Sequence, residues 1–238
     1  RRGCRYCMVF KENHGMKIAL VCPDGLSILL FCKGIIAGLK RIKGAEVFIL
    51  CSEGSYKQEI EDLGVKSLDV QIYRFFSPIR DMAYLLSLYR VFRNERFDII
   101  INFSTKPNIF GSIAAKLSRT NKIVSHVVGL GATFLPDVHM KSKILQYTVL
   151  QFYRIACRMS DSVWFTNKND MDFFLSKGIV APEKVVLTKN YLDVDYYSAR
   201  SIQKGEIEAL KKELRIGDRN KVVVMIARMI WPKGIREF

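Results

Sequence analysis

The chain has 238 residues, of which 49% are hydrophobic and 26% are charged; this is the composition of a globular protein and excludes a disordered or fibrous one. With 38 basic and 23 acidic residues the formal net charge is +15, which predicts an anionic partner: nucleic acid, an anionic membrane surface or a phosphorylated substrate. No apolar run reaches the roughly 18 residues that are needed to span a bilayer.

Residues 1–15 come before the first strand signal and lack the apolar segment of a secretory signal, so we expect them to form an extension outside the fold. This extension holds Cys4 and Cys7 as one C-x-x-C, and His14 could add a ligand. Without a second pair, the spacing does not predict a metal site. The other cysteines lie in apolar strands and helices, where reduced thiols pack as small hydrophobes, so the reducing cytosol is the expected compartment.

Short apolar runs alternate with segments of helical periodicity along the chain. The runs predict strands at residues 16–22, 46–52, 67–73, 97–103, 122–128, 161–166 and 183–188. Helices are predicted between them, at residues 28–42, 77–95, 107–118, 141–159 and 169–178. Strands joined by helices form right-handed crossovers. The sequence therefore predicts an α/β domain over residues 16–198, with a Rossmann-like parallel sheet and helices on both faces.

The rest of the chain begins a second unit. Residues 189–206 show no clear periodicity and read as a linker, residues 207–216 read as a helix, and residues 220–227 as a strand. In the closing stretch, VVVMIARMIWPKGIREF, a strand runs into a basic turn and the start of a helix. Residues 199–238 are therefore predicted to be a linker and the beginning of a second Rossmann-like domain, which is truncated in this chain.

In an open parallel sheet, ligands bind at the carboxyl ends of the strands, and candidate residues follow four of the predicted strands. The turn PDGLS could hold an anion at a helix start, and the glycines of HVVGLGATF allow close backbone approach without completing the G-x-G-x-x-G fingerprint. An Arg and a Lys after the last strand suit a diphosphate, because Arg forks onto two oxygens and Lys supplies a compact charge. The candidates are Asp24, Gly25, Ser104, Thr105, Lys106, Gly129, Gly131, Arg228 and Lys233.

Two further patterns allow more than one interpretation. His126 lies within the fifth predicted strand, where a histidine is more often packed and hydrogen-bonded than catalytic, and catalysis is the alternative. Asp193 and Asp195 form an Asp-x-Asp pattern, but they lie in the predicted linker rather than after a strand of a nucleotide-binding sheet. A metal site is therefore not predicted there.

Several of these stretches together resemble a known family. ARMIWPKGIREF looks like the segment that opens the second domain of family 4 glycosyltransferases, which have two facing Rossmann-like domains, the GT-B fold. SPIRDMAYLLSLYRVFRNERFDIIINFSTKPNIFGSIAAKL and VVGLGATF are similar to the first domain of one subgroup. Members of that subgroup transfer a sugar, often an N-acetylhexosamine, to a polyprenyl-diphosphate-linked saccharide. The resemblance runs from about Met16 to Phe238.

The resemblance implies a retaining transfer of a sugar from a nucleotide-sugar donor, UDP-N-acetylhexosamine, to a lipid-linked or cell-surface glycan in polysaccharide biosynthesis. Arg228 and Lys233 match the pair that contacts the donor diphosphate, so no metal or other cofactor is expected. The first domain would bind the acceptor through PDGLS, STKPN and GLGATF. Because the donor domain is incomplete, this chain alone is expected to be inactive.

A polyprenyl-linked acceptor implies a cytoplasmic protein that is peripheral at the inner face of the cell membrane. The excess of Lys and Arg suits an anionic membrane surface, as do Phe31, Phe152 and Tyr153 on apolar helices, although these aromatics could equally belong to the core.

The chain departs from the family pattern at several positions. Val128 stands where many members carry His, and His126, two residues earlier, does not simply inherit that role. Cys32 stands where Arg is frequent, and the run near the hinge keeps only Asp193. Two rival functions stay open. A GT-B-type nucleotide-sugar epimerase is disfavoured because the chain has only three histidines. A basic nucleic-acid-binding module is disfavoured because no RNA-binding or zinc-finger signature is present, so nucleic acid is not the expected partner.

Overall fold

The computed structural model of the protein describes residues 15–73, 75–130, 140–189, 194, 198, 202–217, 219–227, 229 and 234–238. The chain divides into two units, residues 1–191 and residues 192–238.

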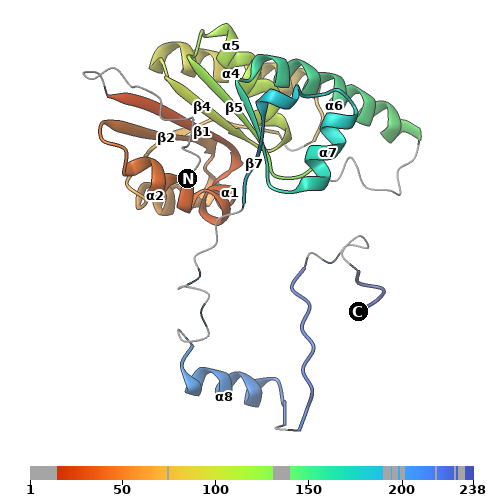
Figure 1. Ribbon diagram of the computed structural model, residues 1–238. Helices are drawn as coiled ribbons and strands as arrows, with labels where there is room; N and C mark the ends of the chain where they lie inside the picture. The colour runs from red at the N-terminus through yellow and green to blue at the C-terminus, as the bar shows by residue number, and fades with distance from the viewer. Residues whose placement is uncertain are drawn as a thin grey trace, which may run out of the picture. The chain divides into compact units, whose positions relative to one another are not determined.

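The first unit is built around a seven-stranded sheet with the strand order β3-β2-β1-β4-β5-β6-β7 (Figure 1). Every neighbouring pair of strands is parallel. The strands are β1 (Met16–Asp24), β2 (Ala45–Ser52), β3 (Lys66–Asp69), β4 (Ile99–Phe103), β5 (Lys122–Val127), β6 (Ser162–Phe165) and β7 (Val185–Leu187). The predicted parallel sheet is confirmed, and because all strands run the same way their carboxyl ends lie along one edge.

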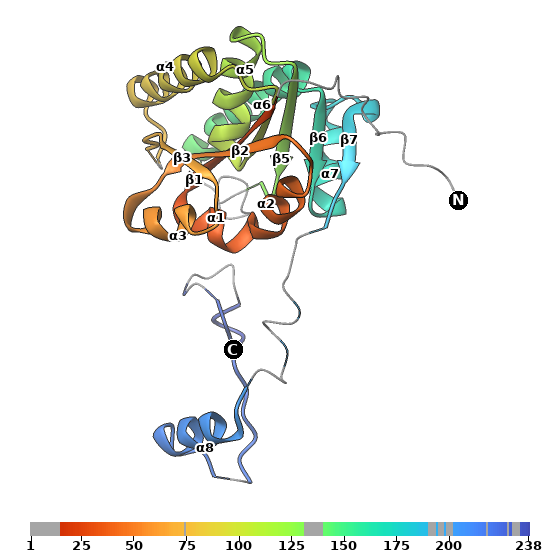
Figure 2. The same cartoon turned by 90° about the vertical axis from the view of Figure 1, so that its left-hand side faces the viewer.

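Helices cover both faces of this sheet, because successive residues of a strand point to opposite sides. Ile18 and Leu20 of β1 pack with Ile28, whereas Ala19 packs with Leu88 on the other face. One face carries α1 (Gly25–Phe31), α2 (Lys33–Lys40) and α3 (Lys57–Glu61); the other carries α4 (Pro78–Glu95), the π-helical turn η2 (Pro107–Gly111), α5 (Ser112–Leu117), α6 (Met140–Met159) and α7 (Lys168–Ser176). Figure 2 shows this division from a second direction.

In the first unit, the structure corrects the predicted elements in three places. The helix expected at residues 28–42 starts earlier, and it breaks at Cys32 into α1 and α2. A 3₁₀ turn (Gly54–Tyr56) leads into α3, for which no helix was predicted because five residues are too few to show a periodicity. The third strand ends at Asp69 instead of residue 73. Residues 70–73 and 75–77 therefore lie in a loop between β3 and α4.

The second unit contains α8 (Lys204–Glu213), which begins with a reciprocal capping box of Gln203 and Glu206. The strand predicted at residues 220–227 is wrong for this structure: none of these residues is in a strand. Val223 and Ile226 are 77% and 96% exposed. A strand forms only when another strand accepts its backbone hydrogen bonds, and the described residues offer it no such neighbour.

The four cysteines that the structure describes pack in the core, as predicted. Cys22, Cys32, Cys51 and Cys157 are free thiols and buried. Burial raises the pKa of Cys51 to about 12 and that of Cys157 to about 12. All four therefore contribute to the core as small side chains. None of the described helices has the length and apolar composition to cross a bilayer.

Candidate functional site at the carboxyl edge of the sheet

Three of the four predicted groups of site residues follow strands that end at the same edge of the sheet. Asp24 ends β1 and Gly25 follows it, residues 104–106 follow β4, and Gly129 lies after β5. Since β1, β4 and β5 are consecutive in the sheet, these turns are neighbours. Gly131, Arg228 and Lys233 lie outside the described residues.

Acidic residues lie at this edge where β1, β2 and β3 end. The Asp24 carboxylate caps α1, accepting from the backbone N–H of Ser27 at 2.7 Å and from its hydroxyl at 2.9 Å. It therefore occupies the helix start at which an anion was predicted. Glu53, at the end of β2, is only 7% exposed, and its backbone N–H donates to Asp69 at 3.2 Å. Carboxylates accept hydrogen bonds from sugar hydroxyls but repel phosphate, so this end of the edge suits an uncharged polar ligand.

Gly25 is required by close packing. A Cβ at this position would lie 2.8 Å from the Cβ of Tyr56 and 2.9 Å from the carbonyl oxygen of Glu53. Any side chain would push α1 away from the turn that follows β2, which is the segment that carries Glu53. Gly25 was predicted to help bind a ligand. In the structure it allows α1 to pack closely against the turn after β2.

The turn after β4 is conformationally unusual. Ser104 has a φ of 74°, a left-handed conformation that is uncommon for a residue with a side chain and that recurs at functional sites. The π-helical turn η2 follows directly, and such turns are also frequent at functional sites. Within η2, Asn108 is fully buried and its side-chain amide donates to the carbonyl oxygen of His126 at 3.0 Å. This bond fixes the end of β5 against the end of β4, leaving the half-buried Ser104 and Thr105 at the edge.

Lys106 does not reach freely over the sheet as the sequence suggested. Its amino group donates to the carbonyl oxygens of Tyr73 at 2.6 Å and Phe75 at 2.8 Å, and it forms an ion pair with Asp81. A lysine ammonium has three N–H donors, and these three partners use all of them. Lys106 therefore holds the β3–α4 loop in place and has no free donor for a phosphate.

His126 has the surroundings of a packed histidine. It is 5% exposed, and its ring lies edge-on to Phe103 and Trp164, with centroid distances of 5.0 and 6.0 Å. Burial lowers its pKa to about 4, so the ring is neutral at physiological pH. Its Nε2 lies 3.4 Å from the hydroxyl of Thr188, and its buried Nδ1 has no partner among the described residues. The geometry favours the packed interpretation over the catalytic one.

The segment after β5 is more accessible. Val128, at the position where the family resemblance led us to expect His, is 40% exposed. A Cβ added to Gly129 would meet no atom of the described residues within 4 Å, so those residues leave room beside the first glycine of the GLG stretch.

Sequence reasoning missed three buried polar residues of this region. Asp81, Asn108 and Glu53 are 3%, 0% and 7% exposed. The only signal for Asp81 was an acidic residue in the first turn of a predicted helix, and Asn108 was visible only as part of the STKPN stretch. Within the described part of the chain, no three His, Cys, Asp or Glu side chains come together as a metal site would require.

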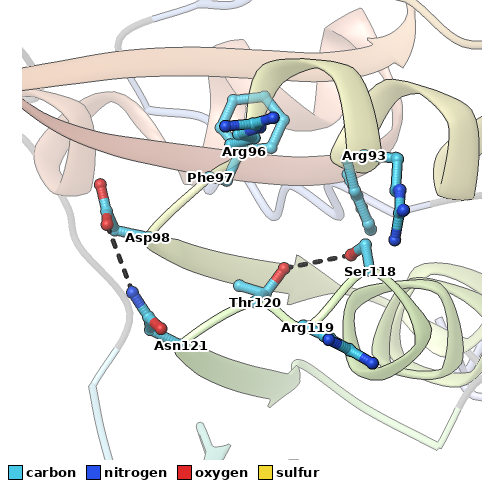
Figure 3. Close-up of a pocket in the computed structure, with 9 residues that line it drawn as sticks. Arg93, Arg96, Phe97, Asp98, Ser118, Arg119, Thr120 and Asn121 are labelled. Carbon is cyan, nitrogen blue, oxygen red and sulfur yellow. Dashed lines mark hydrogen bonds between the residues drawn. The ribbon is translucent and has the colours of Figure 1, made fainter.

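A basic pocket lies at the opposite, amino-terminal edge of the sheet. Its volume is about 420 Å³, and it is formed where α4 leads into β4 and where α5 leads into β5 (Figure 3). Arg93, Arg96 and Arg119 line it. The pocket is therefore separate from the candidate site, which lies at the carboxyl edge.

Comparison with known proteins identifies the family. Residues 17–167 match the model of the family described as "Glycosyl transferase 4-like". The chain is 28% identical over 227 residues to an N,N'-diacetylbacillosaminyl-diphospho-undecaprenol alpha-1,3-N-acetylgalactosaminyltransferase of Campylobacter jejuni, covering 94% of this chain and 59% of the relative. It is 27% identical over 189 residues to a UDP-Gal:alpha-D-GlcNAc-diphosphoundecaprenol alpha-1,3-galactosyltransferase of Escherichia coli, covering 79% and 46%. The chain thus spans about half the length of the curated relatives it matches.

A solved structure shares the fold of this chain. A crystal structure of a glycosyltransferase from Rickettsia africae superposes with a TM-score of 0.66 at 16% identity, over 92% of this chain and 54% of that one. At this identity the likeness concerns the fold, which is that of the GT-B glycosyltransferases. The family match covers β1 to β6 and every described residue of the candidate site at the carboxyl edge. This chain belongs to the Glycosyl transferase 4-like family.

Proposed function

We propose that this chain is the acceptor-binding part of a glycosyltransferase that moves a sugar from a nucleotide sugar to a polyprenyl-diphosphate-linked glycan. The proposal is carried by the two curated relatives, whose names both specify a diphospho-undecaprenol-linked acceptor and which match along 94% and 79% of this chain. The expected donor is UDP-N-acetylhexosamine, and the expected location is the cytoplasmic face of the membrane that holds the acceptor lipid.

The carboxyl edge supports an acceptor role. Asp24 and Glu53 carry carboxylates and the half-buried Ser104 carries a hydroxyl, all at strand ends of one edge. These groups accept and donate hydrogen bonds to sugar hydroxyls. With Lys106 already fully hydrogen-bonded, the edge is suited to the saccharide of the acceptor and not to a diphosphate.

The donor diphosphate would be bound by Arg228 and Lys233 in the complete protein. Departure of the nucleotide diphosphate leaves negative charge on its oxygens, and two fixed cations would stabilise that charge as it develops. They would replace a divalent metal ion in this role. Transfer is expected to retain the anomeric configuration.

A transfer assay with the full-length protein tests the proposal. The protein would be incubated with UDP-sugars and a polyprenyl-diphosphate-linked saccharide, and the extended saccharide would be detected by mass spectrometry. Product formation supports the proposal. Epimerisation of the UDP-sugar without any transfer would replace it with the epimerase alternative. The 238-residue chain alone is expected to give neither product.

A further inference from the structure

The loop that leads into α4, with the first half of that helix, exposes a contiguous set of large apolar side chains. We call this set the α4 apolar surface. Its members and their exposed fractions are Tyr73 (41%), Phe75 (67%), Phe76 (58%), Ile79 (85%), Met82 (53%) and Leu86 (45%). Single exposed apolar residues are ordinary, but a group of neighbours marks an interaction site.

The backbone beneath these side chains is held in place from inside the protein. The buried Lys106–Asp81 pair fixes the carbonyl groups of Tyr73 and Phe75. On the outer side, the guanidinium of Arg80 lies 4.2 Å from the centre of the Tyr73 ring. A buried ion pair is tolerated only where its hydrogen bonds are complete. Here the ion pair and its hydrogen bonds hold the backbone of exposed aromatic residues in place. Packing of the core does not need ordered aromatic residues in solvent, whereas a binding surface does.

The α4 apolar surface continues into a basic one. Met82, Leu86, Arg90 and Arg93 are three or four residues apart, so they follow one stripe along the exposed side of the helix. Arg93 also lines the pocket of Figure 3 together with Arg96 and Arg119. Across the described ranges, none of the arginines at 93, 96 and 119 has a carboxylate within ion-pairing distance.

The acidic group of the pocket does not neutralise these arginines. Asp98 lines the same pocket, but one of its oxygens accepts from the backbone N–H of Lys17 at 2.9 Å and the other accepts from the side-chain amide of Asn121 at 3.4 Å. The pocket therefore has guanidinium groups free to bind an anion, with the buried rings of Phe92 and Phe97 in its wall.

We propose that the α4 apolar surface docks on an anionic lipid bilayer, with its apolar side chains in the interfacial region and the arginines at the C-terminal end of α4 bound to headgroup phosphates. Apolar and aromatic side chains beside Arg are the chemistry of interfacial helices. The proposal deepens the proposed function, on which it rests. Lys106 links the docking loop to the turn after β4, so the bilayer surface would lie beside the edge that binds the lipid-linked acceptor.

Charge favours a bilayer over a second copy of the chain. The chain has a net charge of +15, and a symmetric dimer through this face would bring the same arginines of two copies close together. Of the aromatic residues considered from the sequence for membrane contact, Tyr153 is fully buried, Phe152 is 36% exposed and Phe31 is 55% exposed on the opposite face of the sheet. The α4 apolar surface therefore carries the proposal.

Co-sedimentation of the purified 238-residue chain with vesicles tests the apolar half. The vesicles would be phosphatidylcholine alone, or phosphatidylcholine mixed with phosphatidylglycerol. Because interfacial binding scales with buried apolar area, Phe75→Ser/Phe76→Ser should lower the partition coefficient roughly tenfold or more. The matched control is Leu30→Ser/Leu187→Ser, whose leucines are 54% and 52% exposed on α1 and β7; it should bind as the parent does. Equal thermal midpoints would show that both variants fold.

The basic half has its own pair of variants. Arg93→Gln/Arg119→Gln should reduce the preference for the anionic vesicles by roughly 30-fold, since each of the two cations near such a surface adds about 1 kcal/mol and about 1.4 kcal/mol is tenfold. Arg41→Gln/Lys43→Gln removes two exposed charges from the end of α2, on the other face of the sheet. This control should reduce the preference for the anionic vesicles less. Parent-like binding of the phenylalanine variant, or equal binding of the parent to both vesicle types, overturns the proposal.

The remaining outcomes are also separable. If the parent is a dimer without lipid and the phenylalanine variant is a monomer, the α4 apolar surface binds a second copy of the chain and the proposal is overturned. Vesicle binding needs no sugar transfer, so a failed transfer assay with normal vesicle binding would remove the proposed function and leave the docking surface in place.

Discussion

The ammonium group of Lys106 and the carboxylate of Asp81 form an ion pair across the gap between β4 and α4, with the two side chains 16% and 5% exposed. The residues are 25 positions apart in the chain. The same ammonium binds two carbonyl groups of the β3–α4 loop. One lysine thus ties together the turn after β4, the start of α4 and the exposed aromatic loop.

Replacing Lys106 with Met should destabilise the protein by roughly 3–5 kcal/mol, because it leaves the Asp81 carboxylate buried without its partner. The free energy of unfolding, measured by urea denaturation, checks this. Lys122→Met is the matched control: its ion pair with Asp161 is 3.7 Å long and about half exposed, and exposed pairs contribute roughly 0–1 kcal/mol. Equal losses in the two variants would show that the Lys106 pair has no special role.

Two glycines should respond to alanine in opposite directions. Gly25→Ala places a Cβ 2.8 Å from the Cβ of Tyr56, and such overpacking costs about 1–3 kcal/mol. Gly38→Ala lies in α2 with nothing within 4 Å of its Cβ, and should stabilise the protein by up to about 1 kcal/mol because alanine favours the helix. Chemical denaturation measures the free energy of unfolding, which should fall in Gly25→Ala and rise in Gly38→Ala. If Gly25→Ala is as stable as the parent, α1 can shift away from Tyr56 without cost, which contradicts the prediction.

The fold could be predicted because its signals are local. Each buried strand, such as Ile99–Phe103, is an apolar run, and the long helices have a clear periodicity. Short α3 (Lys57–Glu61) left no such signal. Residues 220–227 show the limit of the method, since their pattern is that of a strand but pairing depends on a neighbour that the pattern does not contain.

The candidate site was predictable in position but not in detail. Strand ends located Asp24, Ser104 and Lys106 at one edge, as topology requires. Which of them is free to bind a ligand depends on partners far along the chain. The bonds of Lys106 to Tyr73, Phe75 and Asp81 span 25 to 33 residues, and no local pattern reveals them.

His126 should make stability pH-dependent below neutrality. Burial lowers its pKa to about 4, whereas the unfolded chain binds the proton near pH 6.5. Between these values the unfolded state binds more protons than the folded state, so the free energy of unfolding falls as the pH drops from 6.5 to 4, by up to roughly 3 kcal/mol. Denaturation of His126→Phe across this range should give a shallower slope than the parent. An unchanged slope would show that His126 does not titrate in this way.

The proposed donor site makes a prediction for the complete enzyme. Arg228→Ala and Lys233→Ala should each lower kcat by roughly 10²-fold or more, the effect of removing a group that stabilises developing charge. Lys221→Ala, which removes an exposed cation from the same segment, is the control and should keep parent turnover. The three rates would be measured with saturating donor in the transfer assay. Parent-like rates for both site variants would remove the assignment of the diphosphate site.

We expect residues 221–226 to change state between this chain and a protein that carries the second Rossmann-like domain of the proposed transferase. In the chain they form no strand, and Val222, Val223 and Val224 are 57%, 77% and 70% exposed. An apolar strand is stable only with neighbours that bond its backbone and cover its side chains. We therefore expect their amide hydrogens to exchange at close to the unprotected rate in the 238-residue chain and at least 10²-fold more slowly in the full-length protein, corresponding to roughly 3 kcal/mol of local protection. The central strand β4 serves as the internal control, protected in both proteins. Slow exchange at residues 221–226 in the short chain would mean that this segment finds its own partner, and the idea that it opens a donor domain would lose its physical basis.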